Sequence, residues 1–488
     1  MEVPLLEDQL ELIGGDGDYR EPKGLKEWWM VVWIETVKLW GIGGPIAFNI
    51  ICQFSTSSAT TMFVGRIGDV ELSAVSISLS VIGCFSFGFL LGMGSALETL
   101  CGQAFGARQV HMLGVYMQRS IIILFVTCIL LLPIYLFATP LLILLGQQPE
   151  IADLAGYYTM LIIPQLFSLA IIFPTQKFLQ AQSKVGLLTW IGFIDLVMHV
   201  FLLWLFIHVL GWGTTGAAVA YNISNWVLAL AQLAYVVGWC KDGWKGLSWS
   251  ALNEIWAFVR LSVASAVMLC LEIWYMMSVT ILTGHLNNAV AAVGSLTICM
   301  NINGWEAMIF IGINAAISVR VSNELGSGHP RATKYVACVT VVQSLLIGIL
   351  CMIVVLATRE HLTFIFTDSP DLHQAVSRLA PLLGVTMVLN SVQPVISGVA
   401  VGGGWQALVA YINLGSYYIF GLPLGFFLGY TFNLGVMGLW GGMIAGTTLQ
   451  TLVLLFVLYR TNWKNEVKLS SERMRKWGGQ NIEPEILY

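Results

Sequence analysis

Two glutamates stand inside long apolar stretches of the sequence. Glu272 lies in the segment LCLEIWY (269–275), and Glu306 lies near the middle of the next apolar stretch, two residues after Gly304. Apolar surroundings remove water from a carboxyl group and favour its protonated form, so each group could take up and release a proton. We predict that Glu272 and Glu306 are proton-coupling residues. The alternative for Glu272 is a glutamate merely hydrogen-bonded across the two halves of the protein, and the alternative for Glu306 is a structural pairing.

Other polar side chains in the apolar stretches are spaced so that pairs share one helix face. Asn390 and Gln393 are one turn apart, and Asp195 and His199 are four residues apart. Residues at these spacings are neighbours on a helix surface. We predict that these four residues and Gln53 line a substrate pathway, with Asp195 and His199 hydrogen-bonded to each other. The alternative for the histidine is an interior side chain satisfied by its neighbours.

Aromatic residues are abundant, with 18 tryptophans and 15 tyrosines. Most are expected at the two membrane–water interfaces. Trp274, Tyr275, Trp305, Tyr411 and Tyr418 fall deeper in the apolar stretches. Their faces would suit a flat polycyclic substrate or an organic cation. We include Trp274, Tyr275 and Tyr411 in the predicted substrate pathway, with plain packing as the alternative for each aromatic.

The composition indicates which elements must position these groups. The chain is 57% hydrophobic and only 10% charged, with a mean hydropathy of +0.79, whereas soluble domains carry about 25% charged residues. This indicates an integral, multi-pass membrane protein. The net charge of −4 gives no basic face for nucleic acid. The nine cysteines form no CxxC pair, no Walker lysine follows a glycine-rich stretch, and no nucleophile–base spacing is present. We therefore expect no metal, no cofactor and no enzymatic activity.

Twelve stretches are long and apolar enough to span a membrane, which takes about 20 residues each. They lie at roughly 36–62, 72–97, 117–140, 155–176, 185–209, 215–238, 255–282, 289–318, 335–357, 376–400, 405–429 and 436–459. Of the 23 lysines and arginines, only Arg66, Arg359 and Arg378 fall in odd-numbered connections. Because cytosolic loops carry the excess of Lys and Arg, both termini are predicted to lie in the cytosol.

The second half of the chain resembles the first at an offset of about 220 residues. The matching pairs keep their order along both halves: Gly92 and Gly312, Ala96 and Ala316, Gly106 and Gly326, Pro174 and Pro394. Each half holds six spans, so both halves enter the membrane from the same side. The fold class predicted is an all-α polytopic membrane protein with twelve transmembrane helices in two six-helix lobes related by a parallel pseudo-two-fold repeat. Two similar lobes with a cavity between them would suit alternating access.

The predicted domain organisation follows from these spans. A cytosolic N-terminal tail covers 1–35, the N-lobe with helices 1–6 covers 36–238, and a cytosolic linker covers 239–254. The C-lobe with helices 7–12 covers 255–459, and a cytosolic C-terminal tail covers 460–488.

Three segments resemble signatures of one transporter family. Residues 97–120 begin LETLCGQAFG, residues 320–331 read RVSNELGSGHPR, and residues 397–406 end GGGWQ. Together they resemble MATE (multidrug and toxic compound extrusion) transporters over essentially all twelve helices. The stretch ICMNINGWEA (298–307) resembles the plant detoxification-carrier branch, and within it the vacuolar flavonoid-type members.

The resemblance implies a V-shaped, two-lobe fold and cation-coupled export of organic solutes, with the proton as the usual coupling ion in plants. Glu272 matches the helix-seven glutamate of plant members. Asn390 stands where many plant relatives have an aspartate, and Thr60 stands where bacterial members have one. Asparagine cannot carry a proton, so the departure at Asn390 leaves Glu272 as the main proton carrier or weakens coupling.

The function predicted is secondary active transport: proton-coupled antiport of an organic solute, of the flavonoid, alkaloid or xenobiotic class, out of the cytosol. An anion (chloride) channel or uniporter on the same scaffold is the alternative, because Asn390 and Thr60 leave a pathway poorer in carboxylates. A lipid-linked flippase is a further alternative, but it would need a basic cavity and additional spans. Large uncoupled currents would identify a channel.

The expected partners are a small organic molecule, protons and the lipid bilayer. No nucleic-acid partner is expected, and we expect the protein to be monomeric. Within the cell, we favour the vacuolar membrane over the plasma membrane. A count of basic residues gives the same orientation for both membranes, so that preference comes from the family resemblance.

Overall fold

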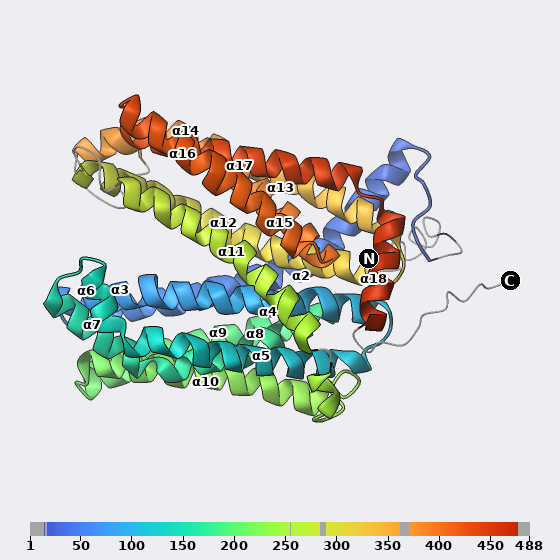
Figure 1. The fold of residues 1–488 in the computed structure, drawn as a ribbon, viewed down its shortest axis with the longest axis horizontal. Helices are drawn as coiled ribbons and strands as arrows, with labels where there is room; N and C mark the ends of the chain where they lie inside the picture. The colour runs from blue at the N-terminus through green and yellow to red at the C-terminus, as the bar shows by residue number, and fades with distance from the viewer. Residues whose placement is uncertain (1–13, 15–16, 254, 284–288, 362–369, 477–488) are drawn as a thin grey trace. The chain divides into compact units, whose positions relative to one another are not determined.

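The computed structural model describes residues 14, 17–253, 255–283, 289–361 and 370–476. Long α-helices make up almost all of this part of the chain (Figure 1). Eleven helices are long and apolar enough to cross a membrane, and one bent pair brings the number to twelve. The all-α, twelve-helix membrane fold predicted from hydropathy is confirmed.

The chain divides into two compact units. The first contains residues 1–47 and 267–473, and the second contains residues 48–266 and 474–488. The first long helix, α2 (Leu25–Val64), therefore belongs to the first unit up to Ala47 and to the second from Phe48. In the same way, α11 (Ile255–Thr283) belongs to the second unit up to Ala266 and to the first from Val267. The predicted lobe boundaries remain a prediction.

The second unit contains five whole spans, the second half of α2 and the first half of α11 around one large apolar core. After α2, its elements are α3 (Asp69–Ile77), π-helical η1 (Ser78–Gly83), α4 (Cys84–Gly106), α5 (His111–Leu136), α6 (Ala138–Leu144), α7 (Pro149–Leu161), α8 (Ile163–Ala181), α9 (Val185–Leu203), π-helical η2 (Trp204–Val209), α10 (Gly213–Trp239) and the 3₁₀ turn η3 (Trp249–Leu252). The fourth span, predicted as one helix over 155–176, is the bent pair α7 and α8, which meet at 49°. Pro164 near the start of α8 has no N–H to continue the α7 ladder, which accounts for the break.

The first unit packs α12 (Ala289–Gly326), α13 (Pro330–Thr358) and α14 (Pro370–Gly403) side by side, with α17 (Gly435–Arg460) against α14. Its remaining elements are α15 (Gln406–Asn413), π-helical η5 (Leu414–Gly421), α16 (Leu422–Phe426), π-helical η6 (Phe427–Thr431) and α18 (Trp463–Lys476) up to Arg473. A small apolar cluster also joins Tyr19, Val31 and Ile34 to Ala332 and Tyr335. Tyr19 and the first turns of α2 are thus part of this unit's core.

Two glycine contacts repeat the sequence offset inside the units. A Cβ atom on Gly312 of α12 would lie 2.6 Å from the Cβ of Ala47, and one on Gly92 of α4 would lie 2.5 Å from the Cα of Ala266. Only glycine allows helices to approach this closely. The first half of α2 therefore packs on α12, and the first half of α11 packs on α4.

Helix α2 starts earlier than the hydropathy indicates. It begins at Leu25, whereas the first apolar stretch begins near 36. Its first turns carry exposed residues such as Trp29 together with buried Val31 and Ile34. Because only one face of these turns is apolar, their mean hydropathy is low, and hydropathy alone does not mark residues 25–35 as part of the spanning helix.

Candidate functional site

Glu272 lies inside the first unit beside a buried amide. Its carboxyl group interacts with the Gln393 side chain of α14, and Gln393 also donates from Nε2 to Ser397 Oγ at 3.3 Å. Helix α11 brings the carboxyl to α14, where Gln393 is only 2% exposed. Two of the residues predicted from the sequence, Glu272 and Gln393, therefore contact each other, and the Ser397 hydroxyl group contacts the second of them.

A π-helical stretch places aromatic rings around this carboxyl group. Tyr417 of η5 is close enough to Glu272 for their charges to interact, and its ring stacks on Tyr275 at 4.5 Å between centroids and 7° between planes. Tyr418 donates its hydroxyl hydrogen to the Leu271 carbonyl at 2.9 Å. π-Helical turns are frequent at functional sites because they redirect side chains. Tyr417 was not among the predicted residues, and nothing in its local sequence separates it from other tyrosines.

Asn390 faces an asparagine across the unit. Its Nδ2 donates to Oδ1 of Asn303 on α12 at 3.1 Å. It also lines a gap with Met276, Thr386 and Thr447 that is too narrow to hold a water molecule. Sequence spacing did not predict this hydrogen bond between two uncharged side chains, because 87 residues separate the two positions.

Glu306 is buried in the first unit with little polar support. The residue is 5% exposed, and neither of its carboxylate oxygens accepts a hydrogen bond within the part of the chain described. The thiol of Cys351 on α13 lies beside it. An unpaired charge buried in this environment would cost several kcal/mol.

Asp195 and His199 lie in the second unit, and each has a partner on another helix. Ser224 of α10 donates to Asp195 Oδ1 at 2.9 Å, while Thr60 Oγ1 and His199 Nε2 are 2.9 Å apart. Gln53 is half-buried on α2. The predicted i, i+4 pair is thus replaced by two contacts to other helices, because both side chains face the helix bundle.

The predicted aromatic residues differ in their surroundings. Tyr275 is fully buried, whereas Trp274 is 40% and Tyr411 is 75% exposed on the surface of the first unit. Trp305 is also exposed. Tyr275, through the ring stack with Tyr417, and Tyr418, through its bond to the Leu271 carbonyl, are the predicted aromatics that the described geometry associates with this carboxyl group.

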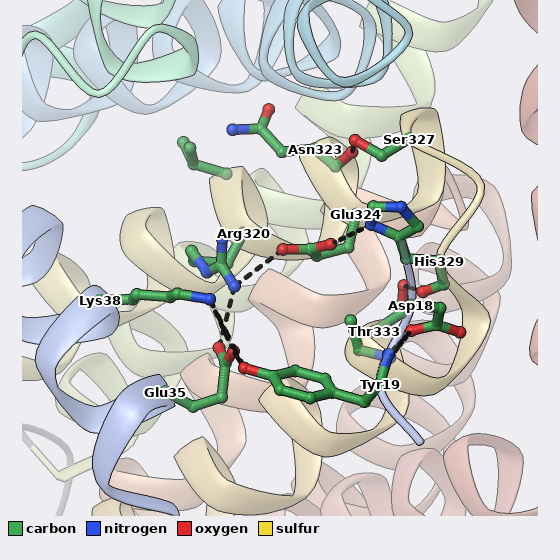
Figure 2. Close-up of polar contacts among 12 residues, drawn as sticks. Asp18, Tyr19, Glu35, Lys38, Arg320, Asn323, Glu324, Ser327, His329 and Thr333 are labelled. Carbon is green, nitrogen blue, oxygen red and sulfur yellow. Dashed lines mark hydrogen bonds and ion pairs between the residues drawn. The ribbon is translucent and has the colours of Figure 1, made fainter. Parts of the chain in front are cut away.

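A second polar cluster, absent from the sequence-based prediction, joins the first half of α2 to α12 (Figure 2). Arg320 Nη2 lies 2.9 Å from Glu35 Oε2 and 2.8 Å from Glu324 Oε1. Glu324 in turn pairs with His329 Nδ1 at 2.9 Å. Glu35 is only 2% exposed and lies 3.5 Å from Lys38 Nζ. We call these residues the Glu35–Arg320 cluster.

The N-terminal segment is fastened to the same place (Figure 2). Asp18 accepts hydrogen bonds from the backbone N–H groups of Arg331 and Ala332, both at 2.8 Å. It thereby caps α13, whose N-cap residue His329 provides no side-chain cap. Tyr19 donates to Glu35 Oε1 at 2.6 Å. Burial, and then the Glu35 carboxylate, raise the pKa of Tyr19, so its hydroxyl remains a donor.

The segment that leads into α11 is fastened in the second unit. Gln118 of α5 donates to the Gly246 carbonyl and accepts from the Ser248 N–H, both at 2.9 Å. Arg119 donates to the carbonyls of Ser250 and Ala251, both at 3.1 Å. This arginine is 1% exposed. The predicted linker is therefore held in place over 246–251.

Comparison with known proteins connects this architecture to a family. The MatE family model matches residues 45–205 and 264–427, which is more than half of the chain. The chain belongs to the MATE family. Protein DETOXIFICATION 35 of Arabidopsis thaliana is 70% identical over 462 residues, covering 95% of each chain. Protein DETOXIFICATION 34 of Arabidopsis thaliana is 65% identical and aligns over 95% of this chain and 86% of the relative.

Solved MATE structures share the fold. The crystal structure of the eukaryotic MATE transporter AtDTX14 matches with a TM-score of 0.86 and 32% identity, over 91% of this chain and 99% of that one. The Vibrio cholerae MATE transporter VcmN in its bent form matches with a TM-score of 0.79 at 18% identity, over 91% and 99% of the two chains. The MATE-family chain is thus a multi-pass integral membrane transporter of small molecules, and not an enzyme.

Proposed function

We propose that this MATE-family protein is a proton-coupled antiporter that moves an organic solute out of the cytosol, with Glu272 as the main proton carrier. The observation that supports this proposal best is the surroundings of Glu272, whose carboxyl group has a neutral amide and tyrosine rings beside it. No lysine or arginine forms an ion pair with it in the described residues. A carboxyl group without a fixed cation is free to change its protonation state during a transport cycle.

Gln393 gives the carboxyl group a partner in both of its states. A glutamine amide can donate its N–H to a carboxylate or accept the O–H of a carboxylic acid. Proton binding would therefore change the charge at Glu272 without leaving a buried polar group unsatisfied. A ligand that binds one protonation state more tightly than the other then shifts the protein between conformations. This is how one proton and one substrate molecule would exchange.

Glu306 is the second proton-coupling candidate, and Asn390, Gln393, Tyr275, Trp274, Tyr411, Gln53, Asp195 and His199 are the proposed pathway residues. The neutral Asn390–Asn303 pair favours the alternative function, an anion channel or uniporter, because two amides repel an anion less than carboxylates would. The two functions make opposite predictions for Glu272, since an uncoupled pathway has no need of a proton carrier.

The substitution Glu272→Gln tests the proposal. Glutamine has the shape of the protonated glutamic acid and cannot release a proton, so pH-gradient-driven accumulation in sealed proteoliposomes should fall to the level of empty vesicles. A panel of flavonoid glycosides, alkaloids and chloride serves as substrate. Glu150→Gln, which makes the same chemical change on an exposed carboxylate at the start of α7, is the matched control and should retain full transport.

Two outcomes would contradict the proton-coupled reading. One is accumulation of an organic substrate against its gradient at the wild-type rate by the Glu272→Gln variant. The other is a large chloride current that is the same with and without a pH gradient, which would favour the channel.

We also propose that the protein acts as a monomer in the vacuolar membrane, with a flavonoid-type solute as substrate. The support is the resemblance of 298–307 to flavonoid-type carriers and the relatives named as detoxification proteins in Arabidopsis thaliana. Fractionation of plant membranes with an antibody against the C-terminal tail would place the protein. Recovery in the plasma-membrane fraction alone would contradict the vacuolar assignment.

A further inference from the structure

Helix α18 follows the last span after a turn of only two residues and runs across the direction of α17 (Figure 1). The end of α17 carries Tyr459, which is 87% exposed, and exposed Arg460. Aromatic and basic side chains gather where a spanning helix leaves the bilayer. Helix α18 therefore starts at the level of the lipid headgroups, on the side predicted to be cytosolic.

Three contacts fix the rotation of α18 about its own axis. Trp405 Nε1 donates to Glu466 Oε2 at 2.9 Å, and the Trp405 ring packs against Trp463 with centroids 5.9 Å apart. Arg473 Nη1 donates to the Gly403 carbonyl at 3.0 Å. Gly404 has a φ of +79°, and a side chain there would run into Arg473. The end of α14 is thus built to receive one face of α18.

Four cations of α18 do not serve this contact, and all of them except Lys476 share a stripe. Lys464, Lys468 and Arg475 follow one another at intervals of four and seven residues, so they lie on one side of the helix. All three are exposed, and none forms an ion pair within the described residues. Trp463 and Ser470, in contrast, are buried against the protein.

We propose that this stripe binds the anionic headgroups of the cytosolic membrane leaflet. A basic helix at the interface attracts anionic lipid, and each lysine or arginine near such a surface contributes about five-fold in affinity at low ionic strength. Because Trp405 and Gly403 hold the helix in place, the backbone that carries the cations is already ordered, and binding costs less conformational entropy than it would for an unfolded tail. The stripe would then hold anionic lipid beside the last span.

The test uses the purified full-length protein in vesicles of phosphatidylcholine, with and without added phosphatidylglycerol. Amide hydrogen exchange of residues 463–476 and the phosphatidylglycerol that remains bound after purification are measured. Anionic lipid should slow exchange in α18 of the wild type, and high salt should remove the effect. The triple variant Lys464→Gln, Lys468→Gln, Arg475→Gln should lose the slowing and retain roughly a hundred-fold less anionic lipid, by the per-residue effect above.

The matched control changes three exposed cations elsewhere: Arg108→Gln, Lys241→Gln and Lys245→Gln alter the net charge equally and should leave the lipid response of α18 intact. If the triple variant frays α18, the double variant Lys464→Glu, Lys468→Glu provides a second test. Its stripe should be repelled by phosphatidylglycerol, which should then speed amide exchange in α18. Equal exchange of wild-type α18 in both vesicles would overturn the proposal. A response of the same size to inorganic phosphate in phosphatidylcholine vesicles would overturn the assignment to a membrane.

Discussion

The segments that lead into α2 and into α11 occupy matching places in the two halves of the sequence, but they are fastened by opposite chemistry. Before α2, the segment itself brings the charge: Asp18 reaches the backbone N–H groups at the start of α13. Before α11, the receiving helix brings the charge: Arg119 of α5 reaches the backbone carbonyls of the segment. The helix contacts at Gly312 and Gly92 are alike, so the repeat preserves the backbone packing and not the fastening.

The difference also separates two kinds of electrostatics. The first unit pairs buried opposite charges, Glu35 with Arg320 and Arg320 with Glu324. The fastening in the second unit places one buried guanidinium against neutral carbonyls. Removing one member of a buried ion pair leaves an uncompensated charge, whereas removing a donor from a carbonyl leaves only an unsatisfied dipole. Substitutions that break the buried ion pairs of the first unit should therefore lower the free energy of unfolding by more than a substitution of Arg119 in the second.

The largest effect is expected for Arg320→Met. It leaves the buried Glu35 carboxylate with Lys38 and Tyr19 alone, and breaking a buried ion pair costs about 3–5 kcal/mol. Thermal unfolding in detergent, followed with a thiol-reactive dye on the buried cysteines, should show a lower midpoint. The double variant Glu35→Gln, Arg320→Met should recover part of the loss. Equal midpoints for the single and double variants would refute an ion-pair origin.

A smaller loss of stability, about 2–3 kcal/mol in the free energy of unfolding, is expected for Arg119→Met, because the carbonyl of buried Ala251 and that of Ser250 lose their charged donor. Amide exchange of residues 246–252 should accelerate, while exchange at the start of α13 stays unchanged. Arg108→Met at an exposed position is the control. Unchanged exchange over 246–252 would mean that Gln118 alone holds the segment.

How far the sequence predicts this molecule depends on the range of the interaction. The spans follow from hydropathy, which is local, and Glu272 with Gln393 could be singled out because each is a polar group in an apolar stretch. Their meeting, like the Asn390–Asn303 bond, joins positions far apart in the chain, and no periodicity encodes such a contact. For Asp195 and His199, the i, i+4 spacing predicts a shared face correctly but not the partners on α2 and α10.

The Glu35–Arg320 cluster shows a different limit. Arg320 and Glu324 lie in the segment 320–331 that resembles a family signature, but the segment indicates no partner for either of them, and Glu35 falls outside the apolar stretch that begins near 36. Arg320 and Glu35 form an ion pair although 285 residues separate them in the sequence. A signal existed in the segment itself: acidic Asp18 and aromatic Tyr19 precede an amphipathic turn with apolar Val31 and Ile34. Such a pattern is compatible with docking, but composition alone favours a solvated tail.

The smallest effect is expected for Asp18→Ala. It should lower the free energy of unfolding by about 1 kcal/mol, which is the usual cost of losing a helix cap. Exchange at Arg331 and Ala332 should accelerate, and residues 246–252 should not respond. Asp18→Asn keeps an oxygen acceptor at the cap and should lose less than the alanine variant. Equal losses in the two variants would show that the carboxylate charge, and not the cap itself, fastens the segment.

The division of α2 between the two units has a consequence for synthesis. Residues 17–47 leave the ribosome early, yet the groups that Asp18, Glu35 and Ala47 contact, namely the start of α13, Arg320 and Gly312, lie more than half a chain later. The opening half of α2 must therefore wait without its packing partners until α13 has been translated. The second unit, by contrast, has all of its spans once the first half of α11 emerges. We therefore expect the second unit to fold first and the first unit to be completed when the opening half of α2 packs against α12 and α13.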